Sequence, residues 1–211
     1  MVARPLGPGD HQRYPTNNIS VERPLMSTRT HALSLKSLAP IRDAIASQNE
    51  SMYEAVIAEF DADDTDRRDC AKSMIFAAAA PAKEPGCWNY VVEPLAKHLG
   101  LDPNYLAIDD WKHYAAWEGY RSVAETMLSP ESTKLLGYIE SGRPFRGVEI
   151  DHDGCLFAWL TNAESTALLS ELEKIDAESF ANVDLDELHE ELVESLKSVV
   201  DSGSEMFIGA S

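Results

Sequence analysis

The stretch Val148-Glu-Ile-Asp-His-Asp-Gly-Cys-Leu-Phe-Ala-Trp159 decides the fold class, because it joins two β-prone runs through a turn. Its Asp153-Gly154 dipeptide is strongly preferred in tight turns between antiparallel strands, where positive φ is required. The aliphatic and aromatic residues on either side are typical of strands. We therefore predict a central β-hairpin in a chain whose other segments are mostly helical in pattern.

Helices are predicted on both sides of this hairpin from capping residues and apolar spacing. Downstream, Thr161-Asn-Ala-Glu164 has the pattern of a capping box, and Asp184-Leu-Asp-Glu187 repeats it before a leucine stripe. Upstream, Ser129-Pro130 is a cap followed by proline in the first helical turn. Further helical segments are expected over residues 37–60 (one helix or two), 66–80, 88–99 and 110–127.

Strands are also expected near both ends of the chain. Residues 30–36 alternate, with Ala32 on one side and Leu33 and Leu35 on the other, which favours a half-buried strand. Glu205-Met-Phe-Ile208 is short and apolar and follows a glycine, as in a terminal strand. The predicted fold is α+β: a small, mostly antiparallel sheet of N-terminal strand, central hairpin and C-terminal strand, packed with about six helices.

Length and composition predict one domain. The chain has 211 residues, of which 44% are hydrophobic, enough for one core. Residues 1–26 contain four prolines and no apolar central region, so we expect a disordered leader, not a signal peptide, before a single domain over 27–211. Met26 is a plausible alternative start. No run approaches the roughly 18 apolar residues of a membrane span. A cytoplasmic protein is the resulting prediction.

The cysteines give no pattern of their own. Cys70, Cys87 and Cys155 are odd in number and widely spaced, without a CxxC pair. This pattern argues against a disulfide framework and against a structural zinc site. We predict no cofactor and no metal ligands.

Negative charge is concentrated at one end of the chain. Residues 147–211 hold 16 of the 36 acidic residues but only Lys174 and Lys197 as bases, so they carry −14 of the formal net charge of −18. Such a field repels phosphate backbones and anionic membranes, and favours basic partners or cations. Because no basic stripe exists, nucleic-acid binding is excluded as a prediction.

Three segments resemble a known family in their order along the chain. They are residues 88–100, a tyrosine-and-leucine helix ending His-Leu-Gly; residues 160–164 after the hairpin; and the ending 202–209. The chain resembles an uncharacterised bacterial family, a domain of unknown function, over roughly residues 30–209. The leader and the segment 61–69 have no counterpart in it. The resemblance implies an α+β fold closing with two acidic helices and a short strand. It implies no activity, ligand or catalytic residue.

The hairpin contains two patterns that could carry chemistry. Glu149-x-Asp151-x-Asp153-Gly154 is similar to the start of a calcium loop, but the twelfth position is Leu160 instead of glutamate. The turn explains these residues, with weak cation binding as the alternative. His152 and Cys155 beside the aspartates do not form a catalytic set, because catalytic groups converge from separate elements. A buried structural cysteine is favoured, and we predict no catalytic residue.

The densest aromatic stretch is residues 109–120. Trp111, Tyr114 and, less closely, Trp117 follow the spacing of a buried helix face, so core packing explains them. A pocket or interface at Trp111 and Trp117 is the alternative. Arg143 and Arg146 form the local basic pair near the acidic end, and we expect them to be internal partners for its acids.

The last helix carries the candidate binding residues Glu187, Glu190, Glu191 and Glu194. A solvated surface explains them, but like charges at helical spacing repel one another, which also indicates a basic partner.

Two functional hypotheses follow. The first is a non-enzymatic cytoplasmic protein-binding protein, similar to inhibitors or immunity proteins, that engages a basic protein. The second is a small-molecule or metal-dependent enzyme with a pocket between the aromatic helix and the hairpin, using His113 or His152. A structural subunit is a third possibility, since the oligomeric state does not follow from the sequence.

Overall fold

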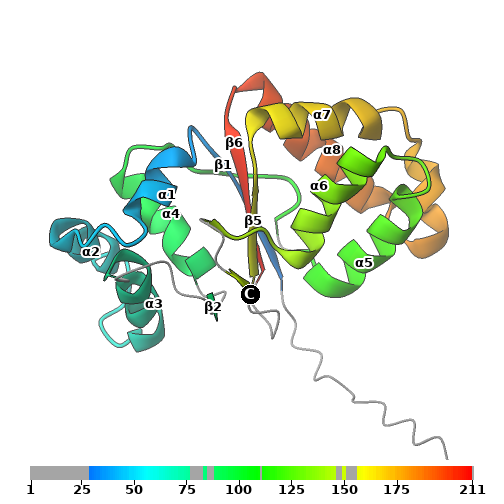
Figure 1. Cartoon of the computed structure of the whole chain (residues 1–211). Coiled ribbons are helices and arrows are strands. Elements are labelled where there is room, and N and C mark those ends of the chain that lie inside the picture. Colours follow the sequence, from blue (N-terminus) through cyan, green and yellow to red (C-terminus); the bar gives the residue numbers. More distant parts are fainter. Residues whose placement is uncertain are drawn as a thin grey trace, which may run out of the picture.

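The computed structural model of the chain describes residues 29–76, 83–84, 88–109, 111–145, 149–150 and 156–210. Within these residues the chain forms an α+β fold of helices around a mostly antiparallel sheet (Figure 1). The strands are β1 (Thr30–Leu35), β2 (Lys83–Glu84), β3 (Asn104–Tyr105), β4 (Glu149–Ile150), β5 (Leu156–Leu160) and β6 (Glu205–Ala210). The α-helices are α1 (Ala39–Ala44), α2 (Glu50–Ile57), α3 (Thr65–Phe76), α4 (Asn89–His98), α5 (His113–Ala124), α6 (Pro130–Ser141), α7 (Asn162–Leu172) and α8 (Asp186–Asp201). A 3₁₀ helix, η3 (Ala177–Val183), precedes α8.

The main sheet has the strand order β3-β1-β6-β5, and all its pairs are antiparallel. β1 and β6 pair along their whole lengths, from Thr30 opposite Ala210 to Leu35 opposite Glu205. The predicted N-terminal and C-terminal strands are therefore confirmed, and they are neighbours at the centre of the sheet. This pairing joins segments that are far apart in the sequence.

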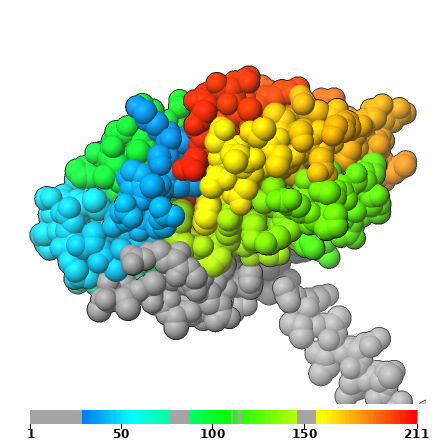
Figure 2. Space-filling model, turned by 45° about the horizontal axis from the view of Figure 1, so that its top comes forward, coloured from blue at the N-terminus to red at the C-terminus, as the bar shows by residue number. Residues whose placement is uncertain are grey.

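Helices cover both faces of the sheet, so the molecule has three layers. In Figure 1, α1 to α4 lie on one side and α5 to α8 on the other, and Figure 2 shows the same division on the surface. Leu33 and Leu35 pack into the core under α1 to α4, whereas Ala32 packs into the core under α5 to α8. The predicted alternation in β1 is correct, but the strand is buried on both faces, not half-buried, because each face has its own helical layer.

The predicted hairpin is only partly found. The second arm forms the predicted strand: β5 lies in the main sheet and pairs with β6. β4, however, pairs in parallel with β2 in a separate two-stranded ladder. The described residues thus place the two arms in different sheets, and the turn at 151–155 lies outside them. Local turn preference could not reveal that each arm has a distant partner.

Helix caps agree with the sequence in two cases of three. Thr161 and Glu164 form the full capping box of α7, and Ser129 caps α6. Asp184 does not cap α8: it ends η3 in the left-handed conformation, with φ of 55°, and Leu185 is the N-cap residue without a side-chain bond. An N-cap side chain needs extended backbone. The turn closed by Asp184 excludes that geometry.

The segment 37–60 forms two helices, α1 and α2, which are separated by a break at residues 45–49. Ala46 and Gln48 there have positive φ, and their N–H groups donate to the carbonyls of Met74 and Ile75 at the end of α3. Asn49 then caps α2 by accepting from the N–H of Met52 at 3.1 Å. The break is therefore held by hydrogen bonds to a neighbouring helix.

One cysteine contradicts the sequence prediction. Cys70 on α3 is disulfide-bonded, and its partner lies outside the described residues. Protein disulfides are typical of oxidising compartments and rare in a reducing cytosol. Separately, none of the helices in the described ranges is long and apolar enough to cross a membrane.

We predict that Gly209→Ala destabilises the protein by about 1–3 kcal/mol, because the added methyl group would crowd the base of the Asn89 side chain, which cannot move away without shifting α4. A Cβ at this position of β6 would lie 2.8 Å from the Cβ of Asn89, where α4 meets the sheet. The matched control is Gly137→Ala in α6, whose Cβ would meet only the end of Arg121 at 3.8 Å. This control should be neutral or stabilising by about 0.5–1 kcal/mol. Urea unfolding of both variants measures the difference, and equal effects would contradict the packing argument.

Candidate functional site

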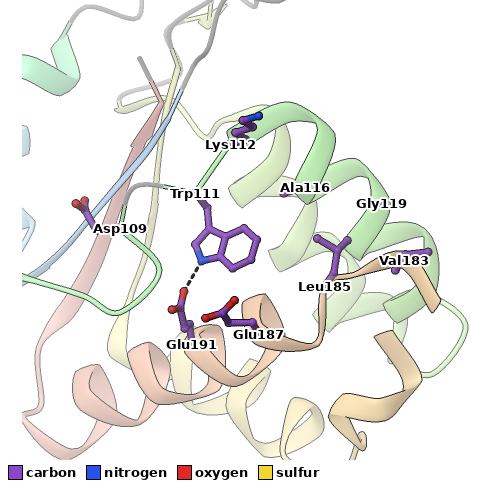
Figure 3. Close-up of a pocket in the computed structure, with 9 residues that line it drawn as sticks. All are labelled: Asp109, Trp111, Lys112, Ala116, Gly119, Val183, Leu185, Glu187 and Glu191. Atoms are coloured by element: carbon purple, nitrogen blue, oxygen red, sulfur yellow. Dashed lines mark hydrogen bonds between the residues drawn. The ribbon is translucent and has the colours of Figure 1, made fainter. Parts of the chain in front are cut away.

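A groove of about 650 Å³ lies between α5, α8 and the two segments that precede these helices (Figure 3). This volume is in the range of ligand-binding clefts. Its walls are formed by apolar and acidic side chains together with one basic side chain, Lys112. The lining residues are Asp109, Trp111, Lys112, Ala116, Gly119, Val183, Leu185, Glu187 and Glu191.

Hydrogen bonds to both the sheet and α8 hold the residues on either side of the groove-lining Trp111 backbone, within 106–109 and 111–112. The N–H of Thr30 in β1 donates to the carbonyl of Trp111 at 2.7 Å. On the other side, the N–H of Ile108 donates to the Ser195 hydroxyl of α8 at 3.2 Å. Trp111 is thus positioned by backbone groups that bond to the sheet on one side and to α8 on the other.

The half-buried Trp111 side chain contacts the acidic face of α8 directly. Its Nε1–H donates to Oε2 of Glu191, and Figure 3 shows the indole ring above Glu191 and Glu187. Lys112 points away from both glutamates in the same view. One wall of the groove is therefore aromatic and one is acidic, with no lysine between them.

The other predicted aromatic residue does not lie in the groove. Trp117 is 1% exposed, and its Nε1–H donates to the Thr30 hydroxyl at 3.1 Å beneath the sheet. Trp111 precedes α5, which begins at His113, so the two tryptophans do not share one helix face. Core packing, the first of the two interpretations of the aromatic stretch, applies to Trp117. The alternative, a pocket, applies to Trp111.

The four predicted acidic residues lie on α8, where Glu191 is half-buried and the other three are exposed, but only two of the four reach the groove. Glu187 and Glu191 line it, whereas Glu190 lines a second depression of about 230 Å³ together with His189. Glu194 is exposed one turn beyond Glu190 and Glu191. In the part of the chain that is described, none of these four carboxylates forms an ion pair.

His113, a candidate in the enzymatic hypothesis, is a buried structural residue. Its Nε2–H donates to the carbonyl of Glu140 at 3.2 Å, and its Nδ1 accepts from the Thr30 hydroxyl at 3.1 Å. We assign this neutral form because a carbonyl can only accept. Burial lowers the pKa of His113 to about 4, although the bond to Glu140 opposes that change. Both ring nitrogens are used within the protein, and His152 lies outside the described residues.

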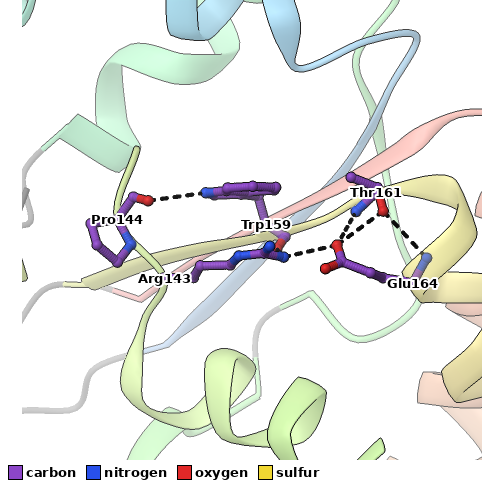
Figure 4. Close-up of polar contacts among 5 residues, drawn as sticks. All are labelled: Arg143, Pro144, Trp159, Thr161 and Glu164. Carbon is purple, nitrogen blue, oxygen red and sulfur yellow. Dashed lines mark hydrogen bonds and ion pairs between the residues drawn. The ribbon is translucent and has the colours of Figure 1, made fainter. Parts of the chain in front are cut away.

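Sequence reasoning missed an aromatic and charged cluster around Arg143 (Figure 4). The Arg143 guanidinium lies 3.6 Å from the ring centroid of Trp159 and 4.5 Å from that of Tyr138. It also pairs with Oε2 of Glu164 at 2.8 Å. The expectation of an internal acidic partner is confirmed for Arg143, and Arg146 lies outside the described residues. The aromatic partners could not be found from sequence spacing, because they come from two separate elements, α6 and β5.

The same cluster changes the acidity of its carboxylate. Burial would raise the pKa of Glu164, but hydrogen bonds from Arg143 and Thr161, together with the Arg143 charge, lower it below the usual value. Glu164 also completes the capping box of α7. The Glu164 carboxylate therefore has a structural role, and Arg143 is its cationic partner.

Metal binding finds no support in the described ranges, which contain no group of three or more histidine, cysteine, aspartate or glutamate residues that could hold an ion. The acidic turn similar to a calcium loop lies mostly outside these ranges.

Fold and groove together define a three-layered α+β protein with an acidic and aromatic surface groove. In comparisons with protein-family models, curated proteins and solved structures, no match to this chain was found. The resemblance to an uncharacterised bacterial family therefore stays a prediction.

We predict that His113 makes the protein less stable as the pH falls from about 6.5 to about 4. In this window the unfolded chain binds a proton that the buried, neutral imidazole does not, so stability is complete above 6.5 and lost below it. The loss amounts to roughly 3 kcal/mol at pH 4. Burial also lowers the pKa of His189, which adds a change of the same sign.

The measurement is urea unfolding of wild type and His113→Gln at pH 7 and at pH 4.5. The variant should be less stable at pH 7 but lose less stability on acidification, because it lacks the histidine that takes up a proton on unfolding. Carboxylates such as Glu164 titrate in both proteins, so their contribution cancels in the comparison. His98→Gln, at an exposed helix end, controls for the loss of a histidine. An equal pH dependence of wild type and His113→Gln would contradict the assignment.

Proposed function

We propose that the protein is a non-enzymatic binding protein that docks on a basic protein through the acidic face of α8, in the manner of an inhibitor or immunity protein. The docking residues are Glu187, Glu190, Glu191 and Glu194, with Trp111 beside them. The observation that carries the proposal is that these four carboxylates have no ion-pair partner among the described residues, while two of them, Glu187 and Glu191, line a groove that also has apolar walls.

Two basic residues of the same layer already pair with other carboxylates. Arg143 pairs with Glu164 at 2.8 Å, and Lys197 of α8 itself pairs with Glu173 of α7 at 3.1 Å. Lys197 is thus directed to α7 and not to the α8 carboxylates. Complementary charge across an interface increases association rates and specificity.

Helix stability explains only part of this acidic face. Glu187 lies in the first turn of α8, where a negative charge interacts favourably with the helix dipole. Glu190, Glu191 and Glu194 lie further along, at spacings of three and four residues, where like charges repel by a few tenths of a kcal/mol per pair. A basic partner would relieve that repulsion.

The enzymatic alternative keeps one supporting observation, the groove beside the aromatic helix. Its proposed histidine does not support it, because His113 is buried, uses both ring nitrogens in the core and is not among the residues that line the groove. We therefore favour binding over catalysis.

The compartment of the interaction stays a prediction. The sequence favours the cytoplasm, whereas the disulfide at Cys70 is more typical of an oxidising environment. A basic partner in either compartment is compatible with the acidic face.

We predict that reversing Glu187, Glu190, Glu191 and Glu194 to lysine weakens capture of the partner at least tenfold, because repulsion replaces attraction. The measurement is affinity capture from extracts of the native cell at low and high salt, followed by quantitative mass spectrometry. Wild type should retain a basic protein in stoichiometric amount, and high salt should release it.

A matched control reverses four exposed carboxylates of the opposite layer. Asp61, Asp63, Asp66 and Asp69 are exposed, and their replacement by lysine changes the net charge equally. Asp66 lies in the first turn of α3, as Glu187 does in α8, so helix dipole effects are matched too. If both variants lose the partner equally, overall charge and not the α8 face mediates capture, and the proposal is wrong.

A further inference from the structure

The Arg143 cluster shows how this protein accommodates a cation between a tryptophan and a glutamate. The guanidinium stacks over Trp159, 3.6 Å from the ring centroid, and pairs with Glu164 at 2.8 Å. It also donates to the carbonyl of Trp159 at 3.1 Å. The face of the guanidinium therefore contacts an aromatic ring, while its N–H groups donate to oxygen atoms of Glu164 and of the Trp159 carbonyl.

The groove beside α8 presents the same pair of chemical groups without the cation. Trp111 lines it, and Glu187 and Glu191 lie below the indole ring in Figure 3. The Trp111 Nε1–H bond to Glu191 fixes the orientation of the ring against the carboxylate. Lys112 points away from both glutamates and does not take the place that Arg143 has in the internal cluster.

We propose that the groove receives an arginine side chain of the basic partner, with its guanidinium stacked on Trp111 and paired with Glu187 and Glu191. This inference rests on the proposed function and adds the residue type that the partner inserts. Val183 and Leu185, which lie across the groove from Trp111 in Figure 3, supply apolar surface for the aliphatic part of that side chain.

Arginine fits this groove better than lysine does. Its planar guanidinium stacks on aromatic rings, pairs with carboxylates through two parallel N–H groups and is less strongly hydrated than an ammonium group. Tryptophan is the aromatic side chain that binds cations most strongly in this way. A partner with lysine at the same position would keep the charge attraction but lose the stacking.

The test uses synthetic, end-capped hexa-arginine and hexa-lysine peptides, which carry equal charge, and free L-arginine as a third probe. Binding to the full chain is followed through the tryptophan indole N–H signals in ¹H–¹⁵N NMR spectra, in which Trp111→Phe assigns the signal of Trp111. We predict that hexa-arginine shifts this signal and binds about five- to tenfold more tightly than hexa-lysine.

Two variants separate stacking from charge. Trp111→Ala should bring the affinity for hexa-arginine close to that for hexa-lysine, because the ring that stacks on a guanidinium is removed together with its hydrogen bond to Glu191. The double variant Glu187→Gln and Glu191→Gln should weaken binding of both peptides, and it keeps the size of both side chains. The NMR measurement on wild type needs no variant, so a misfolded Trp111→Ala protein would not prevent a decision.

The outcomes distinguish this inference from the proposed function. Equal affinities for the two peptides and an unmoved Trp111 signal would overturn the arginine inference, while binding that depends on the glutamates would leave the proposed function intact. Free L-arginine that binds as tightly as hexa-arginine would also overturn it, because the groove would then be a small-molecule site. If neither peptide binds and the α8 reversal does not change capture of the partner, the proposed function fails together with the inference.

Discussion

The antiparallel pairing of β1 with β6 is the constraint on which the rest of this structure depends. It joins residue 30 to residue 210 at the centre of the sheet, so most of the chain lies between two paired strands. Both strands are buried on both faces, which requires two separate helical layers. Polar groups on these strands must therefore find partners inside the protein, and Thr30 does so with His113 and Trp117.

This arrangement also fixes which side of α8 faces the solvent. Leu188, Leu192 and Leu196 are fully buried in the core that includes Ile208 of β6, so the orientation of the helix is set by the sheet. The carboxylates of α8 then point outward along the opposite side as a consequence of packing. Because α5 packs in the same layer and the segment before it is bonded to Thr30, Trp111 is brought beside those carboxylates.

Local features of the fold could be predicted from the sequence, and distant pairings could not. The capping box at Thr161 and the turn signals around α6 act within four residues, so spacing alone identifies them. The partners of β4 and β5 come from elsewhere in the chain, and turn preference contains no information about them. The failure at Asp184 has a similar cause, since the preceding 3₁₀ turn determines its backbone conformation.

The candidate site was predictable in its charges and not in its shape. The glutamates of α8 were identified from charge and helical spacing, but the groove depends on Trp111, whose role differs from that of Trp117 because only Trp117 lies within α5. No sequence pattern marked Val183 and Leu185 as groove residues. They line it because Val183 ends η3 and Leu185 immediately precedes α8. An acidic surface needed only for solubility would require no aromatic ring held against one of its carboxylates. The bond between Trp111 and Glu191 places apolar surface and negative charge side by side, and this combination is the reason for proposing that the face binds a partner.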